Sequence, residues 1–227
     1  VLGRMTREQT LSDHGDLSFA WAPDAAEVFE VYLVPFYVEA REELSVRYGY
    51  TPPPVRIEVF RDLSDFSVRS TGFAGFPALG VCFGPVVTSV SPLSAMRGRF
   101  SWARTAFHEF THVIHLGLSS NRCPRWITEG IATWYESELT GAGRVKGTFN
   151  QMVLRTAALE GRFENIGQAS GGSPQWPSGT RQYAYGSMFF EHLLTRFGKD
   201  RMAAFVEAIA GQWIPYRINA AGKDAFG

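Results

Sequence analysis

The sequence has no excess of either basic or acidic residues, no long apolar run and only two cysteines. Its 22 basic and 22 acidic side chains give a formal net charge of zero over 227 residues. A zero charge argues against a nucleic-acid-binding or anionic-membrane-binding surface, since both need a basic patch. No apolar run approaches the roughly 18 residues that a membrane-spanning helix needs. We therefore expect no nucleic-acid partner and no membrane span in this chain.

Cysteine is scarce, with Cys82 and Cys123 as the two examples. The chain is therefore not a scaffold held together by several disulfides. One disulfide in an oxidising compartment and two buried thiols both stay open, and we favour the thiols. The sequence begins at Val1, without a start methionine or the apolar core of a signal peptide. We expect a mature form from which a targeting segment has been removed.

The chain does have enough apolar residues for a core. Apolar residues make up 45% and aromatic residues 14% of the sequence, which is the composition of a globular protein. Strand-like and helical segments come first, and helical periodicity dominates after Pro92. The expected strands cover 17–22 and 55–60, and one or two more are expected in 80–92, where Gly84-Pro85 favours a sheet edge or a hairpin. The expected helices cover 24–48, 101–117, 124–139, 149–160, 180–197 and 200–210.

Strands followed by helices indicate an α+β protein. We expect an N-terminal lobe with a mixed sheet and helices over residues 1–118, and a helical lobe over residues 119–227. Ser101 and Asp200 are the expected N-caps of the helices that follow them. A cleft between two lobes is a usual place for a functional site, so we expect the site there.

The segment "HEFTH", residues 108–112, holds two of the five histidines with a glutamate between them. Side chains four residues apart on a helix lie on the same face, so His108 and His112 can direct two imidazoles at one metal ion. Two histidines and a carboxylate from elsewhere make a three-ligand zinc site with one open position. Glu109 borders the same point and could take a proton from a water molecule that the metal activates. The segment therefore predicts one zinc ion at a catalytic site.

The third zinc ligand has one leading candidate and two rivals. Glu129 follows His112 by 17 positions, on the next expected helix and after a turn long enough to reverse the chain. Glu136 and Glu138 lie further along that helix. Gly130, next to Glu129, permits close packing of the two helices. Apolar neighbours supply buried surroundings that hold a ligand still: Trp126, Ile127 and Ile131.

His115 lies near the face of His108 but about 10 Å further along the helix axis. It is too far away to share a metal with both expected histidine ligands. We interpret His115 as structural, or as a partner of a ligand.

The stretches "FHEFTHVI" and "PRWITEGIATWYE" together resemble a gluzincin, the zinc metallopeptidase clan whose third ligand is a glutamate on the following helix. The likeness is to the M1-like branch, especially to the small bacterial peptidase-MA-like domains. The opening of the chain and the late stretch "YAYGSMFFEHLLTRFGKD" are also similar to those domains. The resemblance implies a thermolysin-like two-lobe fold with His108, His112 and Glu129 as zinc ligands and Glu109 as general base.

The resemblance also implies an oxyanion donor. In M1 peptidases, a tyrosine three residues before a helix-initial glycine donates a hydrogen bond to the oxyanion. In "YAYG", residues 183–186, that position is Tyr183, and Tyr185 is the near rival. A phenol so placed could stabilise a tetrahedral intermediate.

One departure from the M1 pattern bears on specificity. M1 aminopeptidases carry a Gly-x-Met-x-Asn segment upstream of the zinc helix, which helps to bind the free amine of the substrate. The stretch "SPLSAMRGRF" has Met96 without that pattern, so endopeptidase action is favoured over aminopeptidase action.

Gluzincins also bind extended peptides against an edge strand. Residues 84–90 are the candidate for that edge, with an ordinary sheet strand as the alternative.

We expect a zinc-dependent peptide hydrolase, in which metal-activated water attacks an amide carbonyl of a peptide or protein bound in the inter-lobe cleft. The alternative is a catalytically silent domain that keeps zinc for structure and binds peptides or partners. Glu109 and Tyr183 argue against that alternative, because a purely structural site needs neither. A deformylase-type hydrolase would need an upstream cysteine ligand, and Cys82 lacks a matching context.

The resemblance and the missing start also predict an extracytoplasmic location, periplasmic or secreted. Peptidase-MA-like domains continue into further helix after the point where this sequence ends. We therefore expect the natural protein to be longer than this chain.

Overall fold

The computed structural model describes residues 10–94, 98, 100–171 and 176–227, so Met96 lies outside the described residues. The chain divides into two compact units. Unit 1 comprises Val1–Val46 and Tyr50–Ile114, and unit 2 comprises Arg47–Gly49 and His115–Gly227. The chain combines a mixed sheet with many helices, which confirms the expected α+β class. The predicted lobes, 1–118 and 119–227, stay a prediction.

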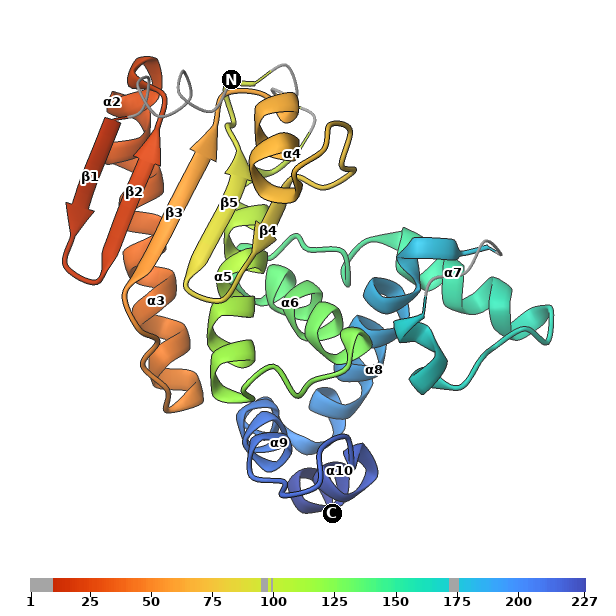
Figure 1. Ribbon diagram of the computed structural model, residues 1–227. Coiled ribbons are helices and arrows are strands. Elements are labelled where there is room, and N and C mark those ends of the chain that lie inside the picture. Colours follow the sequence, from red (N-terminus) through yellow and green to blue (C-terminus); the bar gives the residue numbers. More distant parts are fainter. Residues whose placement is uncertain (1–9, 95–97, 99, 172–175) are drawn as a thin grey trace. The chain divides into compact units, whose positions relative to one another are not determined.

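Unit 1 contains a five-stranded sheet with the order β1-β2-β3-β5-β4 (Figure 1). The two central pairings, β2 with β3 and β3 with β5, are parallel, and the two outer pairings are antiparallel. Ile57 lies opposite Phe19 on one side and Val87 on the other. The strands are β1 Thr10–His14, β2 Leu17–Trp21, β3 Val55–Phe60, β4 Gly80–Cys82 and β5 Val86–Val90.

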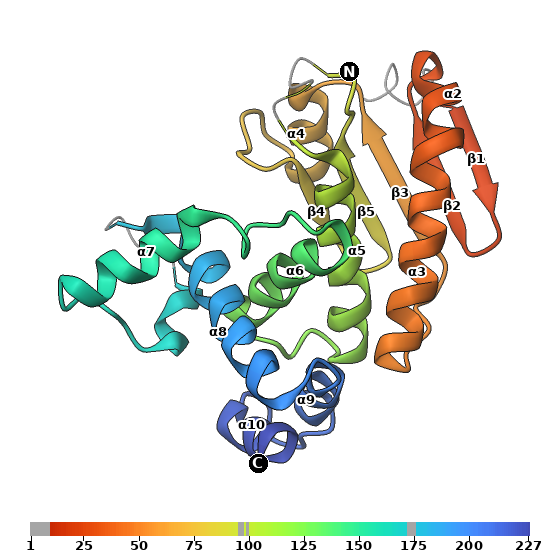
Figure 2. The same cartoon turned by 180° about the vertical axis from the view of Figure 1, so that it is seen from behind.

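Helices cover both faces of this sheet. One face is covered by α3 (Val34–Tyr48) and by α5 (Trp102–Leu118), as Figure 2 shows. Tyr37 of α3 contacts Phe19 of the sheet and Phe110 of α5, with ring centroids 5.9 and 5.7 Å apart. The other face is covered by α4 (Leu63–Thr71), whose Phe66 packs on Phe60 and Val90. The sheet thus has a core on each side, which explains why its central strand is buried almost throughout.

The expected helix at 24–48 is one nearly continuous helical run. It consists of a 3-10 turn, a short α-helix, a π-helical turn and α3, with the bounds η1 Pro23–Ala25, α2 Ala26–Val28 and η2 Phe29–Leu33 before α3. Gly49 follows the run with a φ of 59°, a left-handed conformation that glycine adopts at low cost. The expected strands at 17–22 and 55–60 are confirmed. Strand β1 was not expected.

The expectation that residues 84–90 form the sheet edge is wrong. Strand β5 lies between β3 and β4, so the edge at this end of the sheet is β4, Gly80–Cys82. The cause is a tight hairpin. Gly84 has a φ of 69°, and the amide of Phe83 donates to the carbonyl of Val86 at 2.7 Å. The two-residue turn at Gly84-Pro85 folds β4 back along β5. Strand β4 therefore pairs with the outer side of β5 and becomes the edge strand.

Unit 2 is helical. Four of its helices correspond to the segments expected at 124–139, 149–160, 180–197 and 200–210, and α10 was not expected. Asp200 is the N-cap residue of α9, as expected, although its side chain makes no capping hydrogen bond. The elements are α6 Arg125–Thr140, α7 Thr148–Leu159, η3 Ile166–Ser170, η4 Ser178–Thr180, α8 Arg181–Phe197, α9 Arg201–Ala210 and α10 Ile218–Phe226.

Helices α6 and α8 cross at a pair of glycines. A Cβ atom added to Gly130 would lie 2.7 Å from the Cα of Gly186, and one added to Gly186 would lie 2.2 Å from the carbonyl oxygen of Trp126. Gly130 does permit a close helix crossing, but its partner is α8. The expectation that Gly130 serves the packing of α6 against the HEFTH helix is therefore corrected. The crossing fixes the start of α8 against the start of α6.

Within the described residues, every helix is too short or too polar to span a bilayer. This agrees with the expectation that the chain holds no membrane span.

We predict that Gly186→Ala lowers the free energy of unfolding by about 3 kcal/mol, because the new methyl group meets backbone atoms that cannot move aside. Urea unfolding followed by circular dichroism measures the change. Gly222→Ala on α10 is the matched control, since a Cβ there meets nothing within 4 Å and alanine in a helix interior is favoured by about 0.5–1 kcal/mol. Equal midpoints for the two variants would contradict the proposed crossing.

Candidate metal centre

Helix α5 presents the two histidines of HEFTH side by side. The Nε2 atoms of His108 and His112 lie 3.2 Å apart, and their rings are nearly perpendicular with centroids 4.8 Å apart. Both residues are buried, at 6% and 7% exposure. The Ser101 hydroxyl accepts a hydrogen bond from the amide of Arg104 at 3.4 Å, so Ser101 caps this helix as expected. Fully buried Phe107, Phe110 and Ile114 anchor α5.

The donor set fits zinc. Tetrahedral zinc with Zn–N bonds of about 2.0–2.1 Å holds two nitrogen ligands roughly 3.3 Å apart, and the two Nε2 atoms are 3.2 Å apart. His108, His112 and Glu129 each offer a ligand atom, and these atoms all lie within 4.8 Å of one another. Two imidazoles and one carboxylate are a usual ligand set of a catalytic zinc site.

Glu129 stands on the first turns of α6, and its environment differs from those of its rivals. The Nε of Arg125 lies 3.6 Å from the Glu129 carboxylate, as an i,i+4 ion pair. Glu136 is buried and accepts two hydrogen bonds from the Nε of Arg144, both at 3.1 Å. Glu138 pairs with Lys199. All three carboxylates thus have a cationic partner, but within the described residues it is Glu129 that joins His108 and His112 in a group that could hold a metal ion.

Glu109 packs against the edge strand of unit 1. It is buried at 7% exposure, and a Cβ atom on Gly80 would lie 2.6 Å from its Cγ and 3.0 Å from its Oε1. Burial and then the Glu109 carboxylate raise the pKa of the Cys82 thiol to about 12. The same two causes raise the pKa of Tyr37. Glu109 therefore lies against Gly80 of β4, and its charge acts on the Cys82 thiol and the Tyr37 hydroxyl.

Tyr183 and Tyr185 lie in different surroundings, although both belong to the start of α8. Burial and then the Glu129 carboxylate raise the pKa of Tyr183 above its usual value. The Arg144 guanidinium lies 4.7 Å from the centre of the Tyr183 ring. Tyr185 is buried and stacks on Phe163 with centroids 5.2 Å apart. Tyr183 is therefore the tyrosine that shares its electrostatic environment with Glu129.

Tyr185 lines a separate pocket of about 410 Å³. Arg181, four residues earlier on α8, lines the same pocket, as does Glu164, with which it forms an ion pair. Positions four apart share one face of a helix, and Tyr183 lies between them in sequence. The pocket at Tyr185 thus belongs to another face of α8 than the one that carries Tyr183.

Three residues near the predicted site were not foreseen. Arg125 stands one helical turn before Glu129, a spacing that could have indicated the ion pair. Gly80 lies in a glycine-rich stretch that gave no sign of a contact with Glu109. Arg144 lies in the loop after α6, where the sequence has no periodicity that would indicate a buried arginine.

The remaining expectations concern His115 and the cysteines. His115 is fully buried, and within the described residues it is not part of the metal-ligand group. Cys82 and Cys123 are both free thiols, as the favoured alternative expects, but each is half-buried rather than buried. Cys82 is also absent from the metal-ligand group found among the described residues, which removes support from the deformylase-type alternative.

The chain matches no protein-family model. It is similar to a protein of Treponema pallidum (strain Nichols) described as "Uncharacterized protein", with 31% identity over 107 residues. The match takes in 43% of this chain and 9% of that protein's length. This likeness carries no functional information, so any assignment of function depends on the site itself.

We predict that Glu129→Gln weakens zinc binding by more than the roughly 10–100-fold typical of changes to the outer-shell partners of metal ligands, because an amide is a poorer ligand than a carboxylate. Competition with a chromogenic chelator gives the dissociation constant. Glu138→Gln on the same helix is the matched control and should bind zinc as the unchanged chain does. Equal affinities for the two variants would exclude Glu129 from the ligand set.

Proposed function

We propose that this chain is a zinc-dependent peptide hydrolase of the gluzincin type, with a thermolysin-like two-lobe arrangement and an M1-like site. The observation that carries the proposal is the donor group itself. Two buried imidazole nitrogens lie 3.2 Å apart on one helix, and Glu129 completes a group within 4.8 Å. Glu109, the residue after the first ligand, supplies the carboxylate that a hydrolase needs and a structural site does not.

Each residue of the proposed site has its own role in the reaction. His108, His112 and Glu129 would hold a zinc ion, and that ion would supply Lewis acidity to activate water and to polarise a carbonyl. Glu109 accepts a proton from the attacking water and returns it to the leaving amine. Tyr183 donates a hydrogen bond to the oxyanion of the tetrahedral intermediate.

The edge strand is the proposed binding surface for the substrate. An extended peptide can add to an exposed edge by main-chain hydrogen bonds, and the edge next to Glu109 is β4, Gly80–Cys82. The Gly80 backbone approaches the Glu109 carboxylate without an intervening side chain. A peptide that pairs with β4 would therefore pass close to the general base. With no Gly-x-Met-x-Asn anchor for a free amine in the sequence, we favour cleavage within chains.

The alternative function is a silent domain that keeps zinc and binds peptides or partners. It would use the same three ligands, so metal content does not distinguish the two functions. Turnover does, because only the hydrolase depends on Glu109.

We predict that Glu109→Gln lowers kcat/KM by about 10²–10⁴, the usual contribution of a general base, while zinc binding is kept. The chain and the variant are incubated with an unbiased peptide mixture, and the cuts are mapped by mass spectrometry. Internal cuts that disappear in the variant support an endopeptidase. Cuts confined to N-termini would contradict the endopeptidase assignment, and zinc-loaded protein without any cuts would favour the silent domain.

We predict that Tyr183→Phe lowers kcat by about 10²–10³ with little change in KM, because the lost hydrogen bond forms in the transition state. Steady-state kinetics on a peptide found in the mapping experiment measures both constants. Tyr185→Phe is the matched control two residues away and should change kcat by less than a few fold. A larger effect of Tyr185→Phe would reverse the assignment of the oxyanion donor.

A further inference from the structure

The loop between α9 and α10 exposes three large apolar side chains to solvent. Its sequence from Gln212 to Arg217 is "QWIPYR". Trp213 is 94% exposed, Ile214 is 53% exposed and Tyr216 is 63% exposed. Single exposed apolar residues are common, but such a cluster on one short loop marks an interaction site.

The loop is held in one shape by its own ends. The Gln212 side-chain amide donates to the carbonyl of Arg217 at 2.7 Å and accepts from the amide of Arg217 at 3.0 Å. Arg122 fixes the base of the loop, since its Nη1 donates to the carbonyls of Ala210 and Gln212 at 3.1 and 3.0 Å. These bonds close the loop around four residues whose side chains take no part in them.

The backbone at the tip is also strained. Tyr216 has a φ of 65°, a left-handed conformation that is unfavourable for a residue with a side chain. An exposed ring adds little to the core of the unit, so the strain is not explained by folding. A clamped, strained loop that exposes large apolar side chains is organised for contact with something outside the chain.

The loop carries one cation, Arg217, and no acidic residue. From Ala208 to Lys223 the sequence has no acidic residue and has Arg217 and Lys223 as its cations, and Arg122 lies against the base of the loop. Glu207 and Asp224 lie just outside this segment. With Glu207 and Asp224 counted, residues 207–224 have no net charge, so the positive charge at this place comes from Arg217 in the loop and Arg122 at its base. Charge complementarity indicates an anionic partner.

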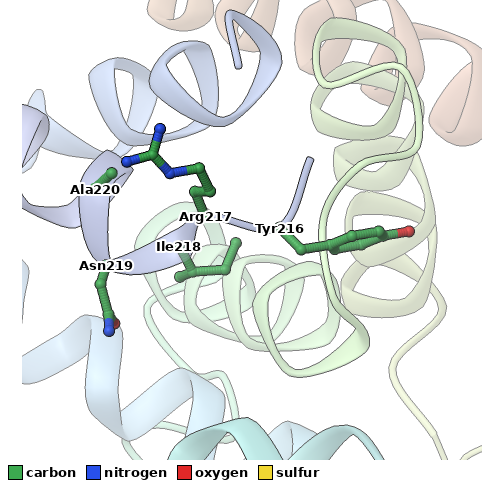
Figure 3. A pocket seen from close by; sticks show the side chains of 5 residues that line it. All are labelled: Tyr216, Arg217, Ile218, Asn219 and Ala220. Atoms are coloured by element: carbon green, nitrogen blue, oxygen red, sulfur yellow. The ribbon is translucent and has the colours of Figure 1, made fainter. Parts of the chain in front are cut away.

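A hollow opens beside the loop. It has a volume of about 320 Å³ and is lined by Tyr216, Arg217 and the first residues of α10, as Figure 3 shows. In that view the Tyr216 ring and the Arg217 guanidinium extend to opposite sides. An anionic headgroup in the hollow would meet Arg217 next to the apolar tip.

We propose that the loop Gln212–Arg217 inserts into the interface of an anionic lipid bilayer. Tryptophan and tyrosine are the side chains enriched at that interface, and nearby arginine and lysine add attraction to anionic headgroups. A tip whose side chains point into solvent needs no shaped counterpart, which suits a fluid surface. Since no helix in the described part of the chain could cross a bilayer, the contact would be peripheral. The proposal does not depend on the proposed hydrolase function.

The test is co-sedimentation of the 227-residue chain with vesicles of phosphatidylcholine alone and of an equal mixture with phosphatidylglycerol. We expect binding to the mixed vesicles and little to phosphatidylcholine. Trp213→Ser should lower the partition coefficient roughly tenfold, in line with the loss of buried apolar area. Arg217→Gln should lower it about fivefold for the mixed vesicles, the effect of one cation near an anionic surface.

Leu159→Ser is the matched control, because Leu159 is a large apolar residue that is 81% exposed at the end of α7. It should bind the mixed vesicles as the unchanged chain does. Binding that Trp213→Ser leaves unchanged, or that is equal for both kinds of vesicle, would overturn the proposal. So would light scattering that shows a dimer without vesicles and a monomer after Trp213→Ser, since the loop would then bind a second copy.

Discussion

The arrangement of the proposed site depends on one constraint, the burial of two imidazole rings with their Nε2 atoms 3.2 Å apart on a single helix. Such a pair is costly unless each nitrogen has a partner, because a buried polar group without one loses its hydration. The two nitrogens lie within hydrogen-bonding distance of each other, and a metal ion would replace that contact by a bond to each. The helix that carries the pair also fixes Glu109, since neighbouring residues on a helix keep a constant angular offset. Three of the four proposed zinc and general-base residues are thus placed by one element.

The fourth residue, Glu129, depends on a different constraint. Its helix, α6, meets α8 where Gly130 and Gly186 leave no room for a side chain. Gly186 lies three residues after Tyr183, so the crossing that fixes α6 also fixes the tyrosine. Arg144 then lies over the Tyr183 ring and binds Glu136. The carboxylate ligand and the proposed oxyanion donor are therefore held by one packing contact in unit 2.

The sequence was most informative where a short pattern carries its own geometry. HEFTH on a helix determines the directions of two side chains, and a glutamate on the next helix has few competitors. It was least informative where the partner is distant in sequence. The packing of Gly80 on Glu109 follows from a hairpin that turns β5 into an interior strand, and a local pattern cannot show which strand of a hairpin forms the edge. Arg144 reaches Glu136 from a loop without periodicity, and the partner of Gly130 lies 56 positions away in α8.

The contact of Glu109 with Gly80 has a consequence for how the carboxylate is positioned. A carboxylate that rests on another side chain moves whenever that side chain changes rotamer. Here Gly80 brings the main chain of β4 against the carboxylate, and β4 is paired with β5 and through it with β3. The hydrogen-bonded sheet therefore restrains the position of the Glu109 carboxylate. Any side chain at position 80 would displace the carboxylate, so the sheet edge can hold Glu109 in this position only while residue 80 is a glycine.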